Sequence, residues 1–478
     1  MIRSLVLLSL ALGLGACAVG PEYEAPDTTA PRFVNADAEH FARTQVEAAW
    51  WREFGDPVLD DLIERALRDG LDVRIAAARL AEARAIYRDA WLDRLPTVSA
   101  HGAYDRREQQ LVGFGTGGDE RVLSETFDLG FDAFWEIDLY GRVRRQAEAA
   151  HAEAQAAEAG LHAAQVSIAA EVARNYLELL GAKRRYAVAL ENRDNQREAV
   201  RITRIRYELG RGTELDLASA RAQLAATEAT LPPLTTAARA AEHRLAVLLG
   251  MAPGTLTIPE SERKAPVSES LAEPLAIGEP ALLLRRRPDI RAAERQLAAA
   301  TARIGVATAD LFPSLSVSGF VGFITGEASE LGEAASEAWS VTPTLSWAAF
   351  DLGSVRARLR AARAQADGAL AAYEQTVLRA LEETENAFVA YAQNQARLRA
   401  LVEQAAASAR AAELARIRYR EGAIEFLRLL DAERTLLEAE DAVARAETDL
   451  NTSVVAIYKA LGGGWEVAPA VAAGPYSH

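Results

Sequence analysis

The chain has very little of the chemistry on which most catalytic and metal sites depend. It contains one cysteine, Cys17, in 478 residues, so neither an intrachain disulfide framework nor a cysteine metal cluster can form. Its six histidines show no ligand spacing such as H-E-x-x-H. The glycine motif Gly113-x-Gly115-x-x-Gly118 lies between two expected strands and not before a helix, so we do not interpret it as a dinucleotide site. We expect no enzyme activity and no cofactor.

Positive charge and long apolar runs are also scarce. The net charge is −15, from 68 acidic and 53 basic residues, which argues against a nucleic-acid partner because phosphate binding needs Lys and Arg. Past the N-terminus, no apolar run approaches the ~20 residues that a transmembrane helix needs.

The N-terminus, residues 1–16, is typical of a secretion signal. Arg3 precedes the apolar stretch from Leu5 to Leu14, which is too short for a permanent membrane helix. The run Leu14-Gly15-Ala16-Cys17 is typical of a bacterial lipobox, so we expect Cys17 to become the acylated first residue of the mature chain and to insert into membrane lipid. An ordinary signal peptide with a chance cysteine is the alternative.

Proline is absent from two long stretches, between Pro96 and Pro232 and between Pro343 and Pro469. The segment from Arg142 to about Leu209 is rich in Ala, Glu, Gln and Arg, which favour helix, and some 65 residues would make a helix of roughly 100 Å. We expect each stretch to form a long antiparallel helical hairpin. In the first, the return helix begins near Glu214, and Pro232-Pro233 break or kink it.

Between the helices the period of the apolar residues changes to two. Apolar and polar residues alternate from Phe127 to Leu139, over more residues than a tilted membrane strand needs. The second half alternates over 315–323 and 339–347, whereas a strand from Val98 to Tyr104 is weaker. The polar face of the first segment carries four acids, which we expect to line a lumen: Asp128, Asp132, Glu136 and Asp138. A half-buried strand of a soluble sheet is the alternative.

These patterns occur twice, which predicts an internal two-fold repeat. Leu95-Pro96-Thr97-Val98-Ser99 matches Phe312-Pro313-Ser314-Leu315-Ser316, and Arg206-Tyr207-Glu208-Leu209-Gly210 matches Arg418-Tyr419-Arg420-Glu421-Gly422. The predicted organisation is as follows: signal peptide, 1–16; lipidated tether, 17–56; first repeat, 57–250, with its strand pair at about 95–139; linker, 251–279; second repeat, 280–462, with its strand pair at about 312–350; C-terminal tail, 463–478. We expect loops over 106–122 and 326–338.

Four strands cannot close a barrel, because the smallest membrane barrels have about eight strands and open edges are not tolerated in lipid. Two chains would give a barrel of about eight strands filled by side chains, and three would give about twelve strands and a lumen. The expected fold class is therefore mixed α and β: a transmembrane β-barrel with four strands per chain, assembled from at least three chains and joined to long helical hairpins.

The chain resembles the TolC/NodT-type outer-membrane efflux lipoproteins, the outer membrane factor family, over nearly its whole mature length. The matching motifs are these: Cys17-Ala18-Val19-Gly20-Pro21-Glu22-Tyr23; Arg286-Arg287-Pro288-Asp289-Ile290-Arg291, followed by Ile304-Gly305-Val306-Ala307 and Leu311-Phe312-Pro313; and Leu429-Leu430-Asp431-Ala432. The resemblance implies a homotrimer whose β-barrel lies in the outer membrane and is continuous with a long α-helical barrel that extends into the periplasm. It also implies two partners, a periplasmic adaptor protein and an inner-membrane transporter.

The resemblance further implies an iris-like gate at the periplasmic end of the tunnel. Asp431 falls where the family places a constriction aspartate, and Asp216 and Tyr419 fall where it has links that hold the tip closed. Leu427 would add an apolar ring. Arg428 stands where some members have a second aspartate, and it lies three residues from Asp431, close enough to pair with it. A solvated helical face is the alternative for these charges.

The implied function is a passive exit duct of a tripartite efflux system for small toxic compounds. Metal efflux and type I protein secretion remain open, as does a structural periplasmic lipoprotein without a pore. The sequence names neither the cargo nor the adaptor and pump that the duct serves.

Overall fold

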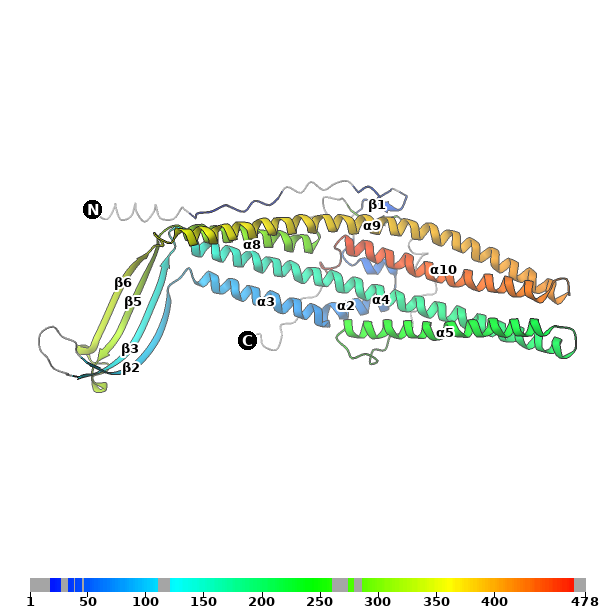
Figure 1. The fold of residues 1–478 in the computed structure, drawn as a ribbon, viewed down its shortest axis with the longest axis horizontal. Helices are drawn as coiled ribbons and strands as arrows, with labels where there is room; N and C mark the ends of the chain where they lie inside the picture. Colours follow the sequence, from blue (N-terminus) through cyan, green and yellow to red (C-terminus); the bar gives the residue numbers. More distant parts are fainter. Residues whose placement is uncertain are drawn as a thin grey trace. The chain divides into compact units, whose positions relative to one another are not determined.

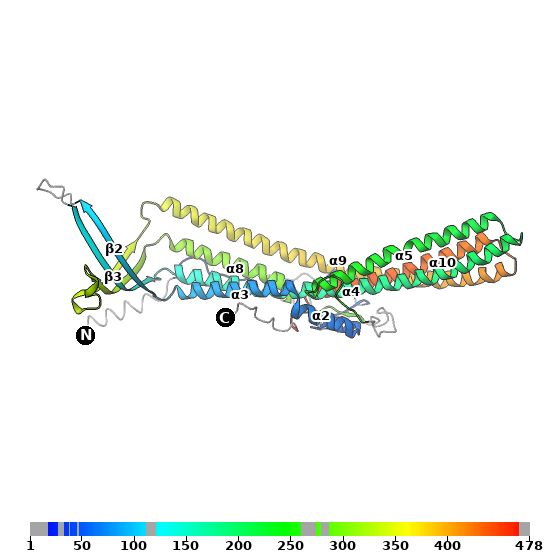
Figure 2. The ribbon, with the colours of Figure 1, turned by 90° about the horizontal axis from the view of Figure 1, so that it is seen from below.

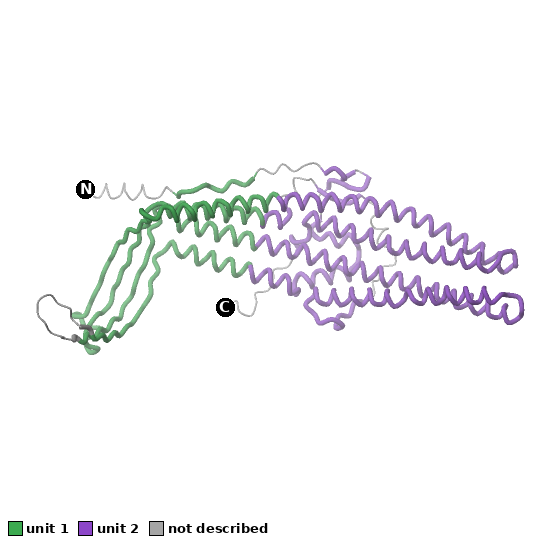
Figure 3. Tube along the Cα trace, viewed as in Figure 1, with its two compact units in different colours: residues 1–26, 80–157, 293–374 green, residues 27–79, 158–292, 375–478 purple. Residues whose placement is uncertain are grey.

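The structure is a computed structural model that describes residues 18–26, 33–37, 39–44, 47–110, 121–259, 274–278 and 286–467. The chain divides into two compact units (Figure 3). Unit 1 comprises residues 1–26, 80–157 and 293–374, and unit 2 comprises residues 27–79, 158–292 and 375–478. Both units take segments from both halves of the sequence, so neither copy of the repeat is a compact unit by itself.

Unit 1 contains an antiparallel sheet of four strands in the order β2-β3-β5-β6 (Figure 1). The strands are β2 (Thr97–Gln110), β3 (Arg121–Ile137), β5 (Ser314–Thr325) and β6 (Glu337–Ser346). The central pair, β3 with β5, joins the two copies of the repeat through a ladder from Ile137 opposite Leu315 to Phe127 opposite Thr325.

One face of this sheet is apolar and exposed. Leu129, Phe131 and Trp135 of β3 lie 54%, 56% and 38% exposed, and Trp339 of β6 lies 77% exposed. Side chains of this size on one face of a single chain are what a lipid-facing barrel wall requires, with Trp suited to the membrane interface.

Four helices continue from the strands of unit 1. They are α3 (Leu71–Leu92), which leads into β2; α4 (Arg142–Glu208), which follows β3; α8 (Pro288–Ala309), which leads into β5; and α9 (Leu352–Arg420), which follows β6. Figures 1 and 2 together show these helices in the order α3-α4-α8-α9 beside the sheet. Contacts agree: Tyr87 of α3 meets His151 of α4, with ring centroids 4.7 Å apart, and Arg303 of α8 pairs with Glu153 of α4.

The rest of α4 and α9 turns back within unit 2. Residues 209–213 connect α4 to α5 (Glu214–Leu248), and residues 421–425 connect α9 to α10 (Phe426–Ala460). Gly210 and Gly422 adopt φ of 66° and 75° at these turns, a conformation that residues with a Cβ rarely adopt. The two expected hairpins are therefore present.

The main core of unit 2 forms where short N-terminal elements pack on the long helices. The elements are β1 (Phe41–Ala42), the 3-10 helix η1 (Trp50–Phe54) and α2 (Pro57–Asp69). Trp50 is fully buried and stacks on Tyr458 of α10 with ring centroids 5.3 Å apart. β1 pairs in parallel with β4 (Leu275–Ala276), from the predicted linker. The segment 17–56 was expected to be an extended tether, but its described residues Phe41 and Trp50 belong to this core.

Two local expectations are wrong. α5 is not broken at Pro232 and Pro233 but runs through both. Both prolines are exposed, so water can bond the carbonyls that lose their donors, while buried Leu234 packs the helix in place. The loop expected over 106–122 is shorter, because β2 and β3 remain paired as far as Gln110 opposite Arg121.

Within the described residues, no helix combines the length and the apolarity that crossing a bilayer would demand.

The Arg286-Arg287-Pro288-Asp289 motif has a structural explanation in unit 2. Arg287 is buried, with 8% of its side chain exposed, and its guanidinium donates to Asp289 (2.7 Å), to Glu383 of α9 (2.9 Å) and to the carbonyl of Ala460 (2.9 Å). One side chain thus ties the start of α8 to both helices of the second hairpin.

We predict that Arg287→Ala lowers the free energy of unfolding of the detergent-solubilised protein by about 1.5–3 kcal/mol, because it removes the charge-assisted hydrogen bonds of a buried guanidinium, whereas the carboxylates of Asp289 and Glu383 stay hydrated at the surface. Urea titration followed by far-UV circular dichroism measures the loss. Arg291→Ala, at an exposed arginine on the same helix, is the matched control and should change the value by less than about 0.5 kcal/mol. Equal losses for the two variants would contradict the role given to Arg287.

Candidate functional site

The residues that bear on function lie in four places: the N-terminal segment, the polar face of the sheet, the junction between β3 and α4, and the hairpin tips. Cys17, the predicted lipidation site, lies outside the described residues. The contacts described below for each place join residues of the same compact unit.

The residues after Cys17 are seated on unit 1. The amide of Val19 donates to the carbonyl of Tyr140 (3.0 Å). Gly20 lies so close to Gly305 of α8 that a Cβ on Gly20 would be 2.5 Å from the Cα of Gly305. The hydroxyl of Tyr23 donates to Glu294 of α8, and burial raises the pKa of this tyrosine, so it stays protonated. These contacts give a reason for the N-terminal motif. The glycine at 305 has a separate reason, because a Cβ there would lie 2.8 Å from Cγ of Arg145 in α4.

On the polar face of the sheet, one histidine lies between two of the predicted acids. The imidazole of His101 in β2 lies 2.6 Å from Asp132 and 3.3 Å from Asp128, both in β3. The strand register causes this, because His101 is opposite Gly130, midway between the two aspartates. Sequence analysis missed His101, which stands in the weakest of the alternating segments.

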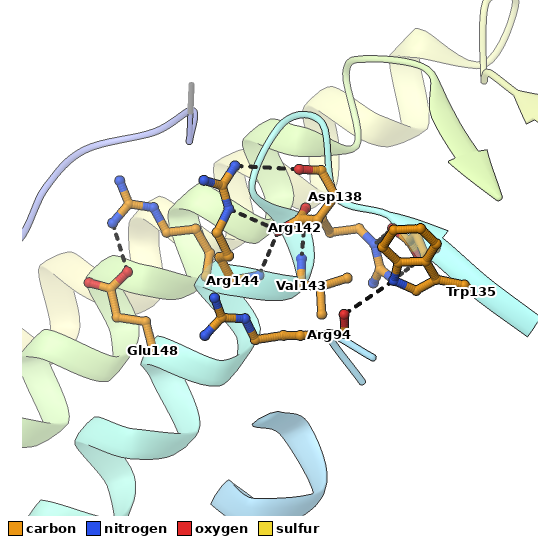
Figure 4. Close-up of polar contacts among 9 residues, drawn as sticks. Arg94, Trp135, Asp138, Arg142, Val143, Arg144 and Glu148 are labelled. Atoms are coloured by element: carbon orange, nitrogen blue, oxygen red, sulfur yellow. Dashed lines mark hydrogen bonds and ion pairs between the residues drawn. The ribbon is translucent and has the colours of Figure 1, made fainter. Parts of the chain in front are cut away.

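The other two predicted acids are held at the junction between β3 and α4 (Figure 4). Glu136 pairs with Arg142, at 2.7 Å to Nε. Asp138 lies beyond the end of β3 and accepts from the backbone N–H groups of Val143 (3.2 Å) and Arg144 (2.9 Å), so it caps the N-terminus of α4.

These contacts bear on whether Glu136 and Asp138 can act as free carboxylates in a lumen. Arg142 and Arg144 offset the charges of Glu136 and Asp138, respectively. Their expected role as free acids along a lumen therefore does not follow from this structure. Asp128 and Asp132 remain the acids of the polar sheet face for which that expectation stands.

The hairpin tips are joined by a contact between the two copies of the repeat. The guanidinium of Arg206 in α4 lies 4.3 Å from the ring centroid of Tyr419 in α9, a cation–π geometry. Tyr419 also packs on Phe426 of α10, with ring centroids 5.6 Å apart, in a small apolar cluster that includes Leu217 and Leu429. Arg206 was not predicted, although its counterpart in the repeat, Arg418, immediately precedes Tyr419.

The predicted gate residues are arranged differently from the expectation in two respects. Asp431 is exposed and pairs with Arg434 (2.7 Å), and no contact joins it to Arg428 among the described residues. An acid that precedes its cation along a helix is the better oriented, which favours Arg434. Asp216 binds within its own helix, where it accepts from the amide of Thr213 (3.1 Å) in a capping box. Leu427 is 41% exposed.

Comparisons with known proteins agree with this architecture. The family model described as "Outer membrane efflux protein" matches residues 62–251 and 280–463, one match in each half of the chain. The chain is 33% identical to the outer membrane protein OprJ of Pseudomonas aeruginosa over 96% of this chain and 95% of that protein. It is 34% identical to the pyoverdine export outer membrane protein OpmQ of Pseudomonas putida, over 97% of this chain and 98% of that one.

Two solved structures share the fold. The outer-membrane channel OprN has a TM-score of 0.89 and 51% identity, with 94% of this chain and 100% of that chain covered. The open state of the MtrE outer membrane channel of Neisseria gonorrhoeae has a TM-score of 0.83 and 29% identity, with 94% and 99% covered. The predicted fold class, a mixed α and β protomer of a trimeric channel with four barrel strands per chain, is confirmed. The chain belongs to the outer membrane efflux protein family.

Proposed function

We propose that the chain is the outer-membrane exit duct of a tripartite efflux system and passes small toxic compounds through a homotrimeric channel. The observation that carries this proposal is the four-stranded sheet with an exposed apolar face, joined in sequence to two long helical hairpins. The names of relatives support the cargo class, since one is an antibiotic efflux pump outer membrane protein and another a toluene efflux pump outer membrane protein, both from Pseudomonas putida.

The duct would work passively, with an inner-membrane transporter as the source of energy and a periplasmic adaptor as the link. Lipidation at Cys17 would add an anchor to the outer membrane, and the contacts of residues 18–23 would hold that anchor against unit 1. Metal efflux and type I protein secretion are the alternative cargoes, and a structural periplasmic lipoprotein is the alternative of another class.

Deletion of the gene, followed by growth on a panel of antibiotics, organic solvents and metal salts, tests the proposal. We expect sensitivity to several small organic compounds, restored by the wild-type chain on a plasmid. Sensitivity to metal salts alone would assign the cargo to metals, and a purified protein that forms no conducting trimer in lipid bilayers would overturn the duct itself.

At the tip, we propose that the contact of Arg206 with Tyr419 holds the two hairpins together when the channel is closed. Tyr419→Ala removes the cation–π contact and a partner of Phe426, so it should raise the open probability severalfold in planar bilayers. Tyr207→Ala is the matched control: this tyrosine is adjacent to Arg206 and 42% exposed, and within the described part of the chain its side chain makes no ring-stacking, cation–π or hydrogen-bond contact. An equal effect of both variants would exclude a specific latch.

A second prediction concerns the acidic residues, and planar-bilayer recordings test it as well. If Asp431 narrows the closed pore, Asp431→Ala raises single-channel conductance. If Asp128 and Asp132 line the lumen, replacing both with Asn lowers the preference for cations, because two carboxylates per chain lose their charge. Unchanged conductance would remove Asp431 from the gate, and an unchanged reversal potential would remove the two sheet acids from the lumen.

A further inference from the structure

Three arginines on the first turns of α9 have no hydrogen-bond or ion-pair partner among the residues that the structure describes. Arg356, Arg360 and Arg363 are exposed, and none makes a hydrogen bond or ion pair with any residue that the structure describes. They are four and three residues apart, so they share one side of the helix. A row of three unpaired cations beside a membrane-facing sheet calls for an anionic partner from outside the chain.

The contacts of α9 show which side this is. Arg358 lies 4.0 Å from Asp310, just past the end of α8, so its side of α9 faces α8. Two residues along a helix correspond to a rotation of about 200°. Arg356 and Arg360, each two residues from Arg358, therefore face away from α8, at the free edge of the row of helices in unit 1 (Figures 1 and 2).

The opposite edge of the same row carries acids. Glu82 and Asp89 of α3 are exposed, and their side chains make no hydrogen bond or ion pair with the described residues. Tyr87 marks the side of α3 that faces α4, because its ring contacts His151. Asp89 is two residues from Tyr87, so it faces away from α4.

The two sets of charges lie at matching levels. Asp89 is about 5 Å from the end of α3 that leads to the sheet, and Arg356 is about 6 Å from the corresponding end of α9. Further from the sheet, Glu82 lies about 15 Å from that end of α3, and Arg363 about 17 Å from that of α9. An exposed apolar residue accompanies each row: Ile86, 52% exposed, on α3, and Leu370, 37% exposed, on α9.

We propose that these rows form an ionic seam between protomers: the acids Glu82 and Asp89 of one chain meet the arginines Arg356, Arg360 and Arg363 of the next. α3 leads into β2 and α9 follows β6, and these are the two edges of the sheet that must pair between copies. A ring built from one repeated interface needs two different, complementary patches on each chain, which the two rows supply. The seam rests on the trimer of the proposed function.

The seam fixes the register of α9 along α3 of the neighbouring chain and the orientation of that chain, and it contributes less to the affinity between the chains. A shift of one α9 along α3 by a helical turn would place Arg356 away from Asp89, and a chain in the reversed orientation would bring like charges together. Anionic lipid headgroups are the other class of partner that would suit three arginines. They give no account of a matching acidic row at the same level with exposed Ile86 beside it, so a second copy of the chain is favoured.

Disulfide trapping tests the seam in the full-length, membrane-inserted protein. The only native cysteine is Cys17, so a chain carrying Asp89→Cys and Arg356→Cys has a single engineered pair. Mild oxidation should convert most of this double-cysteine protein to covalent dimers and trimers, which a non-reducing gel separates. The matched control carries Asp89→Cys and Arg358→Cys, whose second cysteine faces α8 in its own chain, and should give at most a tenth as much crosslinked product.

A native trimer without crosslinks from the first pair would overturn the seam and leave the duct intact, whereas a wild-type protein that forms no trimer would overturn the duct.

Charge reversal supplies a test that does not depend on cysteine chemistry. Replacing the three arginines with Glu should lower the fraction of heat-resistant trimer at least fivefold, and adding Glu82→Arg and Asp89→Arg to that same chain should restore most of it. Arg88→Glu, an exposed charge on another side of α3, should have no effect. A loss that the acidic reversals do not rescue would assign the arginines to anionic lipid and overturn the seam.

Discussion

The outer edges of β2 and β6 carry backbone N–H and C=O groups that need partners, and hydrocarbon offers none. The rest of the assembly depends on this constraint. A sheet of four strands with one exposed apolar face cannot close on itself, so the chain is complete only beside copies of itself. Because a helix leads into or follows each strand, whatever pairs the sheet edges also brings α3 of one chain near α9 of another.

The parts of the fold that the sequence predicts are those whose signal is local. Alternation over Phe127 to Leu139 locates β3, and the absence of proline with a high content of Ala, Glu and Arg locates α4 within one residue of its observed end. The position of Asp431 near the start of a return helix was predictable from the repeat for the same reason. None of these inferences needs to know which segments meet in space.

The features that the sequence does not predict depend on contacts between segments that are far apart in sequence. The placement of His101 between Asp128 and Asp132 follows from the register of β2 on β3, which no single strand specifies. The contact between Arg206 and Tyr419 requires the two hairpins to lie together. Asp138 illustrates the opposite error: the alternating pattern continues past the end of the strand, so a residue that caps α4 appeared to belong to the polar face of β3. Pattern alone cannot tell a strand from the turn that follows it.

The close approach of Gly20 to Gly305 has a consequence for the order in which the protein is made. Residues 18–23 leave the ribosome early, yet their seat is formed largely by α8, which belongs to the second copy of the repeat and is synthesised much later. Contacts between residues so far apart in sequence form slowly, because a long loop must close first. The N-terminal segment that begins at residue 18 is therefore among the last parts of the structure to be fixed, because α8 of the second repeat must fold before it can hold this segment.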